Sequence, residues 1–155
     1  MTQKQTTDPI LVPVDFSPHS AAAILCACEL AECMKRPIVV LHVVHDPAEM
    51  PGYYSKLTKK KNLTRMEDLA KEMLDRFTQD LQTKHPQLQS LKKSQAMLVL
   101  GLPVTRILQV ADKLHASMIV MGSQGLTGLK HLLLGSKAEQ VVQLATVPVT
   151  IVKAK

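Results

Sequence analysis

The sequence predicts an α/β protein with a single open parallel β-sheet and helices on both of its faces. Short apolar segments alternate with longer segments whose apolar residues recur at helical spacing, in the order β-α-β-α-β-α-β-α-β. The apolar segments are nearly continuous, which is typical of parallel strands covered on both faces. With 155 residues, 46% of them hydrophobic, the chain is long enough to form one domain around such a core.

The first strand is expected at Ile10–Val14, an apolar run that ends at Asp15. Ser17 suits the N-cap and Pro18 the first position of the helix that follows, and Pro37 closes this helix. Its apolar face is expected to carry Ile24, Leu25, Cys28 and Ala31.

The β-branched run Ile38–Val44 predicts the second strand. Residues 46–62 contain prolines, a glycine and several lysines, and we expect them to form a flexible loop. Thr64–Glu67 has the form of a capping box and predicts the start of a long helix that ends before Pro86. The apolar face of that helix is expected to comprise Leu63, Met66, Ala70, Met73, Leu74, Phe77 and Leu81.

The remainder of the chain predicts three more strands separated by two helices. The strands are expected at Ser94–Leu100, Ser117–Met121 and Val147–Val152. Apolar spacing predicts a helix around Ile107–Leu114. A second capping box at Ser136–Glu139 predicts a short helix that runs to about Ala145.

The domain is expected to span residues 9–153, after a polar and disordered extension at residues 1–8 that has no apolar core. This extension therefore resembles neither a signal peptide nor an anchor, and no apolar run is long enough to span a bilayer. We expect a cytoplasmic protein without a membrane partner.

Three cysteines, Cys26, Cys28 and Cys33, lie in the first expected helix. Their odd number does not suggest a disulfide framework, and their helical spacing is poor for zinc. We expect them to be small buried side chains in a reducing compartment.

The formal net charge of +6 would by itself allow contact with nucleic acid. Aromatic residues, however, make up 3% of the chain and tryptophan is missing, so the sequence lacks the stacking platforms that bind single strands. Nucleic acid is therefore not expected as the main partner.

Three residues are expected at the carboxyl ends of strands: Asp15, Gly101 and Gly122. In open α/β sheets ligands bind beyond this edge, where the strand order reverses. Asp15 could bind a ribose hydroxyl, an adenine amine or a metal, or it could cap the following turn through Ser17. Its place at a strand end favours binding.

The segment from Gly122 to Gly125, here called the glycine turn, is followed after nine residues by Gly135 and Ser136. Glycine allows close approach of a backbone and positive φ, and successive N–H groups can bind an anion. Ser136 could cap the next helix or bond a phosphate at its N-terminus. The spacing matches neither the Walker A loop nor the dinucleotide fingerprint. Phosphate binding is favoured, and simple turns and caps are the alternative.

These residues resemble the ATP-binding branch of the universal stress protein family, whose hallmark is G-x2-G-x9-G-[ST]. The hallmark is matched at Gly122, Gly125, Gly135 and Ser136, and the family resemblance extends to ILVPVDFS at the start, VVLHVV in the second strand and GLP at Gly101–Pro103. It covers roughly residues 9 to 153.

The resemblance implies a Rossmann-like sheet of order 3-2-1-4-5, similar to the adenine nucleotide alpha hydrolase fold. It implies bound ATP, or ADP or AMP, accompanied by Mg²⁺ or Mn²⁺, and a homodimer formed through Val147–Val152. The implied nucleotide-binding residues are Pro13, Val14 and Asp15 for adenine and ribose, Val43 for the base, Met121, Gly122, Ser123 and Gly125 for ribose and the first phosphates, and Gly135, Ser136 and Lys137 for the outer phosphates.

Three positions depart from the family pattern. Leu126 stands where a basic residue is common, Gln124 where His or Arg is common, and Lys137 where an apolar residue is common. The first two remove phosphate contacts and the third supplies one, so the preference among ATP, ADP and AMP stays open.

The leading hypothesis is a nucleotide-dependent regulator of a stress response, with unknown protein partners and without a dedicated catalytic set. A slow ATPase or phosphotransferase using Lys130 and His131 is the first alternative, although His131 has no visible acid or nucleophile partner. The second alternative is a partner-binding module that holds no nucleotide. His42 is expected to be a partly buried core histidine.

Overall fold

The computed structural model describes residues 8–45, 60–126 and 134–154. Its strands are β1 (Ile10–Pro13), β2 (Ile38–Val44), β3 (Gln95–Leu100), β4 (Met118–Gly122) and β5 (Val149–Val152). Its helices are α1 (Pro18–Met34), α2 (Lys60–Lys84), α3 (Gln89–Lys92), α4 (Pro103–Lys113) and α5 (Ser136–Leu144).

All five strands are parallel and form one sheet in the order β3-β2-β1-β4-β5. This confirms the predicted fold class and strand order. The chain builds outward from β1 through β2 to β3, and then returns to place β4 on the other side of β1. The strand order therefore reverses between β1 and β4, which is where such sheets bind ligands.

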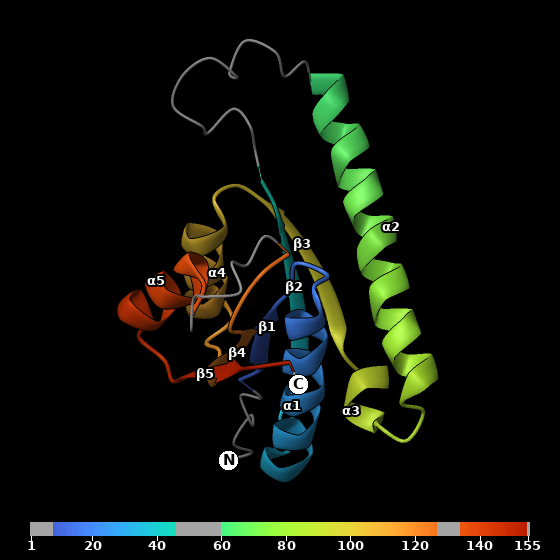
Figure 1. Cartoon of the computed structure of the whole chain (residues 1–155), viewed down its shortest axis with the longest axis vertical. Coiled ribbons are helices and arrows are strands. Elements are labelled where there is room, and N and C mark those ends of the chain that lie inside the picture. The colour runs from blue at the N-terminus through green and yellow to red at the C-terminus, as the bar shows by residue number, and fades with distance from the viewer. Residues whose placement is uncertain (1–7, 46–59, 127–133, 155) are drawn as a thin grey trace, which may run out of the picture.

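The sheet separates two apolar cores. On one face α1 and α2 pack on a cluster that includes Ile24, Val40 and Leu74. On the other face α4 and α5 pack on a cluster that includes Ile107 and Val141. Figure 1 shows the two groups of helices on opposite sides of the sheet. The three central strands β1, β2 and β4 are largely buried, which explains why their apolar runs in the sequence are nearly continuous.

The long helix α2 differs from the prediction at its start. It begins at Lys60, so that residues 60–62, expected in the loop, are helical, and the Thr64–Glu67 capping box lies inside the helix. Lysine is a good helix former and asparagine is tolerated, so the helix extends beyond the boundary pattern. The rest of the expected loop, residues 46–59, lies outside the described residues, as do residues 1–7 of the expected extension.

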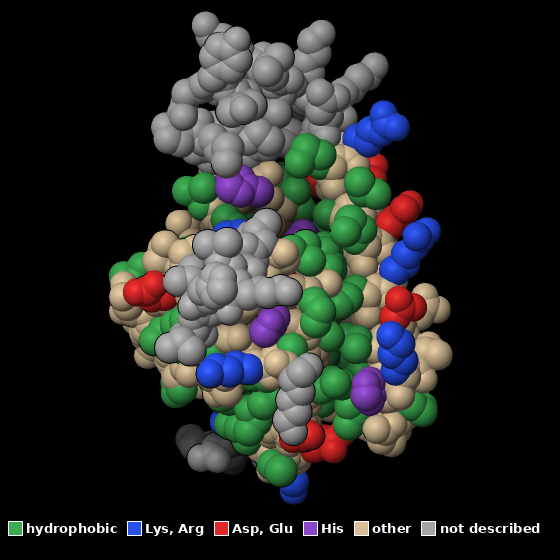
Figure 2. Space-filling model, viewed as in Figure 1, with side chains coloured by type: hydrophobic (Ala, Val, Ile, Leu, Met, Phe, Trp, Pro, Cys, Tyr) green, Lys and Arg blue, Asp and Glu red, His purple; other side chains and the backbone are tan. Residues whose placement is uncertain are grey.

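The apolar face predicted for α2 is only partly buried. Ala70, Leu74 and Leu81 are buried, whereas Met66 and Met73 are 37% and 43% exposed. The N-terminal half of α2 extends past the end of the sheet (Figure 1). Figure 2 shows charged side chains along the outer edge of α2 and hydrophobic ones on the side toward the middle of the molecule.

Sequence reasoning missed the short helix α3, because four residues are too few to display a helical period. Its Leu91 is fully buried and fixes this segment beneath α1. The helix α4 also begins earlier than its apolar spacing suggested, with Pro103 at its first position.

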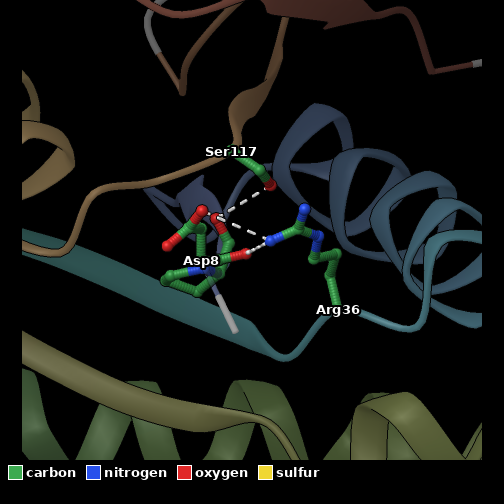
Figure 3. Close-up of polar contacts among 4 residues, drawn as sticks. Asp8, Arg36 and Ser117 are labelled. Carbon is green, nitrogen blue, oxygen red and sulfur yellow. Dashed lines mark hydrogen bonds and ion pairs between the residues drawn. The ribbon is translucent and has the colours of Figure 1, made fainter. Parts of the chain in front are cut away.

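Polar contacts fix the amino-terminal edge of the sheet (Figure 3). Arg36 Nη1 lies 3.4 Å from the carbonyl and 3.4 Å from the carboxylate of Asp8. Ser117 donates to the carbonyl of Pro9 through its Oγ–H at 3.2 Å and its backbone N–H at 2.9 Å. Asp8 is thus held in place, although the sequence assigned it to the disordered extension.

All three cysteines are free. Cys28 is buried and Cys26 is partly buried, but Cys33 is exposed, so the expectation of a buried side chain is wrong for Cys33. It lies near the end of α1 on the side away from the sheet, next to the exposed Met34. Within the described ranges, no helix combines the length and apolarity needed to cross a membrane.

Candidate functional site

Three strand ends meet at the carboxyl edge of the sheet, as predicted. Asp15 follows β1 and Gly122 ends β4, and these two strands are neighbours at the centre of the sheet. Gly101 follows the edge strand β3, two strands away from β1. Its N–H donates to the carbonyl of Val44 at 2.9 Å, which continues the β2–β3 pairing beyond the strand. The centre of the site is therefore formed by β1 and β4.

The carboxylate of Asp15 accepts three hydrogen bonds at this point of the sheet. Its Oδ1 accepts the side-chain O–H of Ser20 at 2.7 Å and the backbone N–H of Ser17 at 3.1 Å. Its Oδ2 accepts the backbone N–H of Leu126 at 3.0 Å. The carboxylate thus connects the end of β1 to the start of α1 and to the glycine turn after β4. Asp15 thus makes the turn-capping bonds that were the structural alternative for it.

The electrostatics of Asp15 follow from these contacts. Burial alone would raise the pKa of its carboxyl, but the hydrogen bonds from Ser17, Ser20 and Leu126 stabilise the anion and bring the pKa below its ordinary value. Asp15 is therefore ionised at neutral pH. It presents a negative, acceptor-only group at the strand end, which suits hydroxyl or amine donors of a ligand.

The start of α1 is fixed by two serines. Ser17 is the N-cap, and its side chain accepts the backbone N–H of Ser20 at 3.1 Å, as predicted for the cap. The Oγ of Ser20 in turn accepts the backbone N–H of Asp15 at 3.0 Å. Sequence reasoning missed Ser20, although its spacing of three residues from a capping serine was a usable signal.

Two glycines of the turn lie close to other parts of the chain. A side chain at Gly122 would place its Cβ within 2.7 Å of the Cβ and 2.8 Å of the carbonyl carbon of His19. A Cβ at Gly125 would collide with the Asp15 carboxylate. Among the described glycines only Gly101 has a positive φ. Of the two properties that glycine allows, positive φ and close approach, the structure therefore uses close approach at Gly122 and Gly125.

Gly135 connects the glycine turn to α5. Its N–H donates to the carbonyl of Ser123 at 2.7 Å, and its extended backbone forms the N-cap of the helix. Ser136 is the first helical residue and makes no capping bond, so its predicted role as the cap is wrong by one residue. Ser136 and Lys137 are both exposed at the beginning of α5, next to the glycine turn.

The remaining predicted residues divide between the two faces of the sheet. Val43 and Met121 belong to the core on the α4 and α5 face, on either side of β1. Pro13 is buried in β1. The side chain of Val14 is packed in the opposite core, against α1 and α2, so Val14 can contribute only backbone atoms at this edge.

His42 matches the prediction of a partly buried core histidine. Its Nδ1–H donates to the carbonyl of Val14 at 2.8 Å, and its ring lies 4.3 Å from that of Phe16. Phe16 in turn contacts Phe77 of α2 edge to face at 5.5 Å. Burial lowers the pKa of His42, and the charge of Lys137 lowers it further, outweighing the contacts with Val14 and Asp15 that raise it. His42 is thus a neutral donor beneath the site.

Metal ligands are not clustered in the described part of the chain: it holds no group of three His, Cys, Asp or Glu side chains able to bind an ion. Lys130 and His131 lie outside the described residues. A small hollow lined by Leu108, Asp112 and Thr146 lies between α4 and the end of α5, at the opposite edge of the sheet from Asp15. This hollow plays no part in the candidate site.

Comparison with known proteins places this site in context. The model of the universal stress protein family matches residues 6–153. The universal stress protein MJ0577 of Methanocaldococcus jannaschii is 28% identical over 156 residues, which cover 94% of this chain and 94% of that protein. The family match over residues 6–153 therefore includes every residue of the candidate site.

Solved structures share the fold. UspA of Lactobacillus plantarum superposes with a TM-score of 0.71 at 23% identity, over 94% of this chain and 97% of that chain. The universal stress protein of Archaeoglobus fulgidus, in complex with dAMP, superposes with a TM-score of 0.59 at 25% identity, over 94% and 97% of the two chains.

Proposed function

Because the chain belongs to the universal stress protein family, we propose that it binds an adenine nucleotide between the ends of β1 and β4. The observation that carries this proposal is the junction of Asp15, the glycine turn and the N-terminus of α5. The Asp15 carboxylate accepts the N–H of Leu126, and the N–H of Gly135 donates to Ser123. The dAMP complex of the Archaeoglobus fulgidus protein, which is 25% identical, supports an adenine nucleotide as the ligand.

The nucleoside would occupy the β1 end of the site. The ionised Asp15 accepts hydrogen bonds and suits ribose hydroxyls or the adenine amine. Its Oδ2 accepts the N–H of Leu126 at 3.0 Å and has a second lone pair with which it could accept a ligand hydroxyl. Val43 and Met121 supply apolar surface on the same face of the sheet, which suits the base.

The phosphates would lie at the beginning of α5. This helix has nine residues, and its first N–H groups and dipole favour an anion. Ser136 offers an exposed hydroxyl and Lys137 an exposed ammonium there. Because a single phosphate would not need the extra cation, Lys137 favours a nucleotide with outer phosphates, and we propose ATP.

A divalent ion would be held chiefly by the phosphates. Mg²⁺ usually keeps several waters and binds through substrate phosphates and one or two carboxylates. Asp15 is the carboxylate nearest the glycine turn among the described contacts, and three hydrogen bonds already occupy it. The bound nucleotide would act as a regulatory ligand in a stress response.

The edge strand β5 is the proposed dimer contact. It lies at the end of the sheet and has an apolar sequence, and such an edge is normally covered. The three free thiols favour a reducing compartment, so we also propose a cytoplasmic location. Light scattering across a dilution series tests the dimer, and a monomer at every concentration would contradict it.

The nucleotide is tested by denaturing freshly purified protein and identifying any released nucleotide by mass spectrometry. Titration calorimetry with AMP, ADP and ATP, with and without Mg²⁺, then ranks the ligands. Asp15→Ala should abolish the heat of binding, and Asp80→Ala on the exposed side of α2 is the matched control. A folded protein that arrives empty and gives no heat with any of the three nucleotides would exclude the proposed function.

A further inference from the structure

Ser123 is a junction inside the glycine turn, and it is 2% exposed. Its N–H donates to the carbonyl of Val152 at 2.8 Å, and its carbonyl accepts the N–H of Gly135 at 2.7 Å. Its Oγ lies 3.3 Å from Nδ1 of His19. One residue of the turn therefore contacts the end of β5, the start of α5 and the start of α1.

His19 completes a closed set of contacts. Its Nδ1 also accepts the backbone N–H of Ala154 at 3.1 Å, just beyond the end of β5. Since a backbone N–H can only donate, Nδ1 carries a lone pair, and the Ala154 N–H and the Ser123 hydroxyl share it as donors. In Figure 1 the chain after β5 crosses the front of the molecule to reach α1.

The backbone of His19 touches the turn as well. Its carbonyl carbon is where a Cβ at Gly122 would collide, at 2.8 Å. His19 thus contacts the glycine turn through both its backbone and its ring. A movement of the turn would shift the ring and, with it, the hydrogen bond to Ala154.

We propose that His19 is a positioning residue that couples the glycine turn to residues Val152–Ala154. Ligand binding that holds the turn in this conformation then strengthens the contact between His19 and Ala154. By linkage, a C-terminal segment held on His19 improves nucleotide binding by the same factor. The effect on affinity rests on the proposed function, whereas the contact with Ala154 is given by the structure itself.

The test compares two substitutions in the full chain. His19→Leu keeps the approximate volume of the side chain and removes the acceptor. His19→Asn retains an acceptor close to the position of Nδ1. Amide hydrogen exchange at Ala154, followed by NMR in the ligand-free protein, should accelerate at least about tenfold in His19→Leu and recover in His19→Asn.

The same variants are then titrated with Mg-ATP and AMP. We expect His19→Leu to weaken binding about three- to tenfold and His19→Asn to restore most of it. Nucleotide should slow exchange at Ala154 in the wild type but not in His19→Leu. Ser123→Ala removes only the hydroxyl contact, and its effect on affinity should not add to that of His19→Leu.

The possible failures are distinguishable. A wild type that binds no nucleotide overturns the proposed function, while the exchange data still decide whether His19 holds Ala154. Unchanged exchange at Ala154 in His19→Leu overturns the coupling, even if nucleotide binds. If His19→Leu does not fold, Ser123→Ala replaces it, and exchange and affinity equal to the wild type then overturn the coupling.

Discussion

The Oδ2 atom of Asp15 accepts the backbone N–H of Leu126 at 3.0 Å, which joins two residues 111 positions apart in the chain. The other oxygen of the same carboxylate accepts donors from Ser17 and Ser20 at the start of α1. A single ionised side chain thus orders both the first turn of α1 and the glycine turn. Both carboxylate oxygens must be acceptors, because Ser17, Ser20 and Leu126 all donate to them.

Asp15→Asn is expected to lower the free energy of unfolding by about 1–3 kcal/mol at neutral pH. An amide offers one acceptor oxygen, and its NH₂ group would face a donor. Since the pKa of Asp15 is lowered in the fold, its contribution is fully present above about pH 3.9 and is lost as the pH falls below that value. The variant should therefore lose less stability than the wild type on acidification. Urea unfolding between about pH 2.5 and 7 measures both effects.

Asp80→Asn is the control for Asp15→Asn, because Asp80 is exposed on α2. It should change stability by less than about 0.5 kcal/mol. Equal acid dependence in the wild type and Asp15→Asn would mean that the hydrogen bonds at Asp15 do not hold its charged form.

Gly122→Ala and Gly125→Ala should differ, although the motif treats the two glycines alike. The Cβ at position 122 meets the backbone of His19 in α1, which cannot move without displacing the helix. The Cβ at position 125 meets the end of the Asp15 side chain, which can rotate away. We expect a loss of about 3 kcal/mol or more for Gly122→Ala and about 1 kcal/mol for Gly125→Ala, from unfolding curves.

Although Gly125→Ala should be the more stable of the two variants, we expect it to bind nucleotide poorly. The reason is that the added Cβ displaces the Asp15 carboxylate, which then no longer faces the nucleotide. A Gly125→Ala protein with wild-type affinity would show that Asp15 does not contact the nucleotide. A Gly122→Ala protein as stable as the wild type would contradict the close packing on His19.

His42 should make stability depend on pH near neutrality. Burial lowers its pKa in the fold, so the unfolded chain binds the proton more readily. The contribution of His42 is fully present above about pH 6.5 and is lost as the pH falls through the folded pKa. His42→Phe keeps a ring beside Phe16 and removes the titration, so its unfolding free energy should vary less between about pH 5 and 6.5.

His115→Asn is the matched control for His42, because His115 is exposed and its left-handed backbone is one that asparagine tolerates. It should change the free energy of unfolding at neutral pH by less than about 0.5 kcal/mol. If His42→Phe retained the full wild-type slope, the pH dependence would have to arise elsewhere in the molecule.

The strands and the location of the site were predictable because local patterns determine them. Ile38–Val44 is a strand in both the prediction and the structure, since a run of β-branched residues covered on both faces has few alternatives. The strand ends then follow from the topology. The partners across the site were not predictable in this way. The bond between Asp15 and Leu126 depends on a turn and a strand end that only tertiary packing brings together.

Helix boundaries and the contacts of single side chains could not be predicted from the sequence either. The predicted N-cap of α5 was Ser136, whereas the structure has Gly135, one position earlier. Both residue types are common at N-caps, so the sequence did not distinguish them. His19 carries no periodic signal and precedes the first buried position of α1, yet its ring reaches both Ser123 and Ala154. Met66 and Met73 fit the helical period and yet are 37% and 43% exposed, because the period indicates a face of the helix and not how much of that face is covered.

Lys137 should decide which nucleotide is preferred. It is exposed in the first turn of α5, where an ammonium group can reach outer phosphates but has no role in the core. Lys137→Met keeps the length of the stem and removes the charge, so Mg-ATP affinity should fall about fivefold, as expected for an exposed charge contact of about 1 kcal/mol. AMP affinity and the melting temperature should stay close to those of the wild type. Lys113→Met, at the far end of α4, is the control and should alter neither affinity. Calorimetric titrations of the three proteins at one ionic strength make the comparison, because screening weakens such a contact. Equal losses for ATP and AMP would place Lys137 near the first phosphate instead, and no loss for either would remove it from the site.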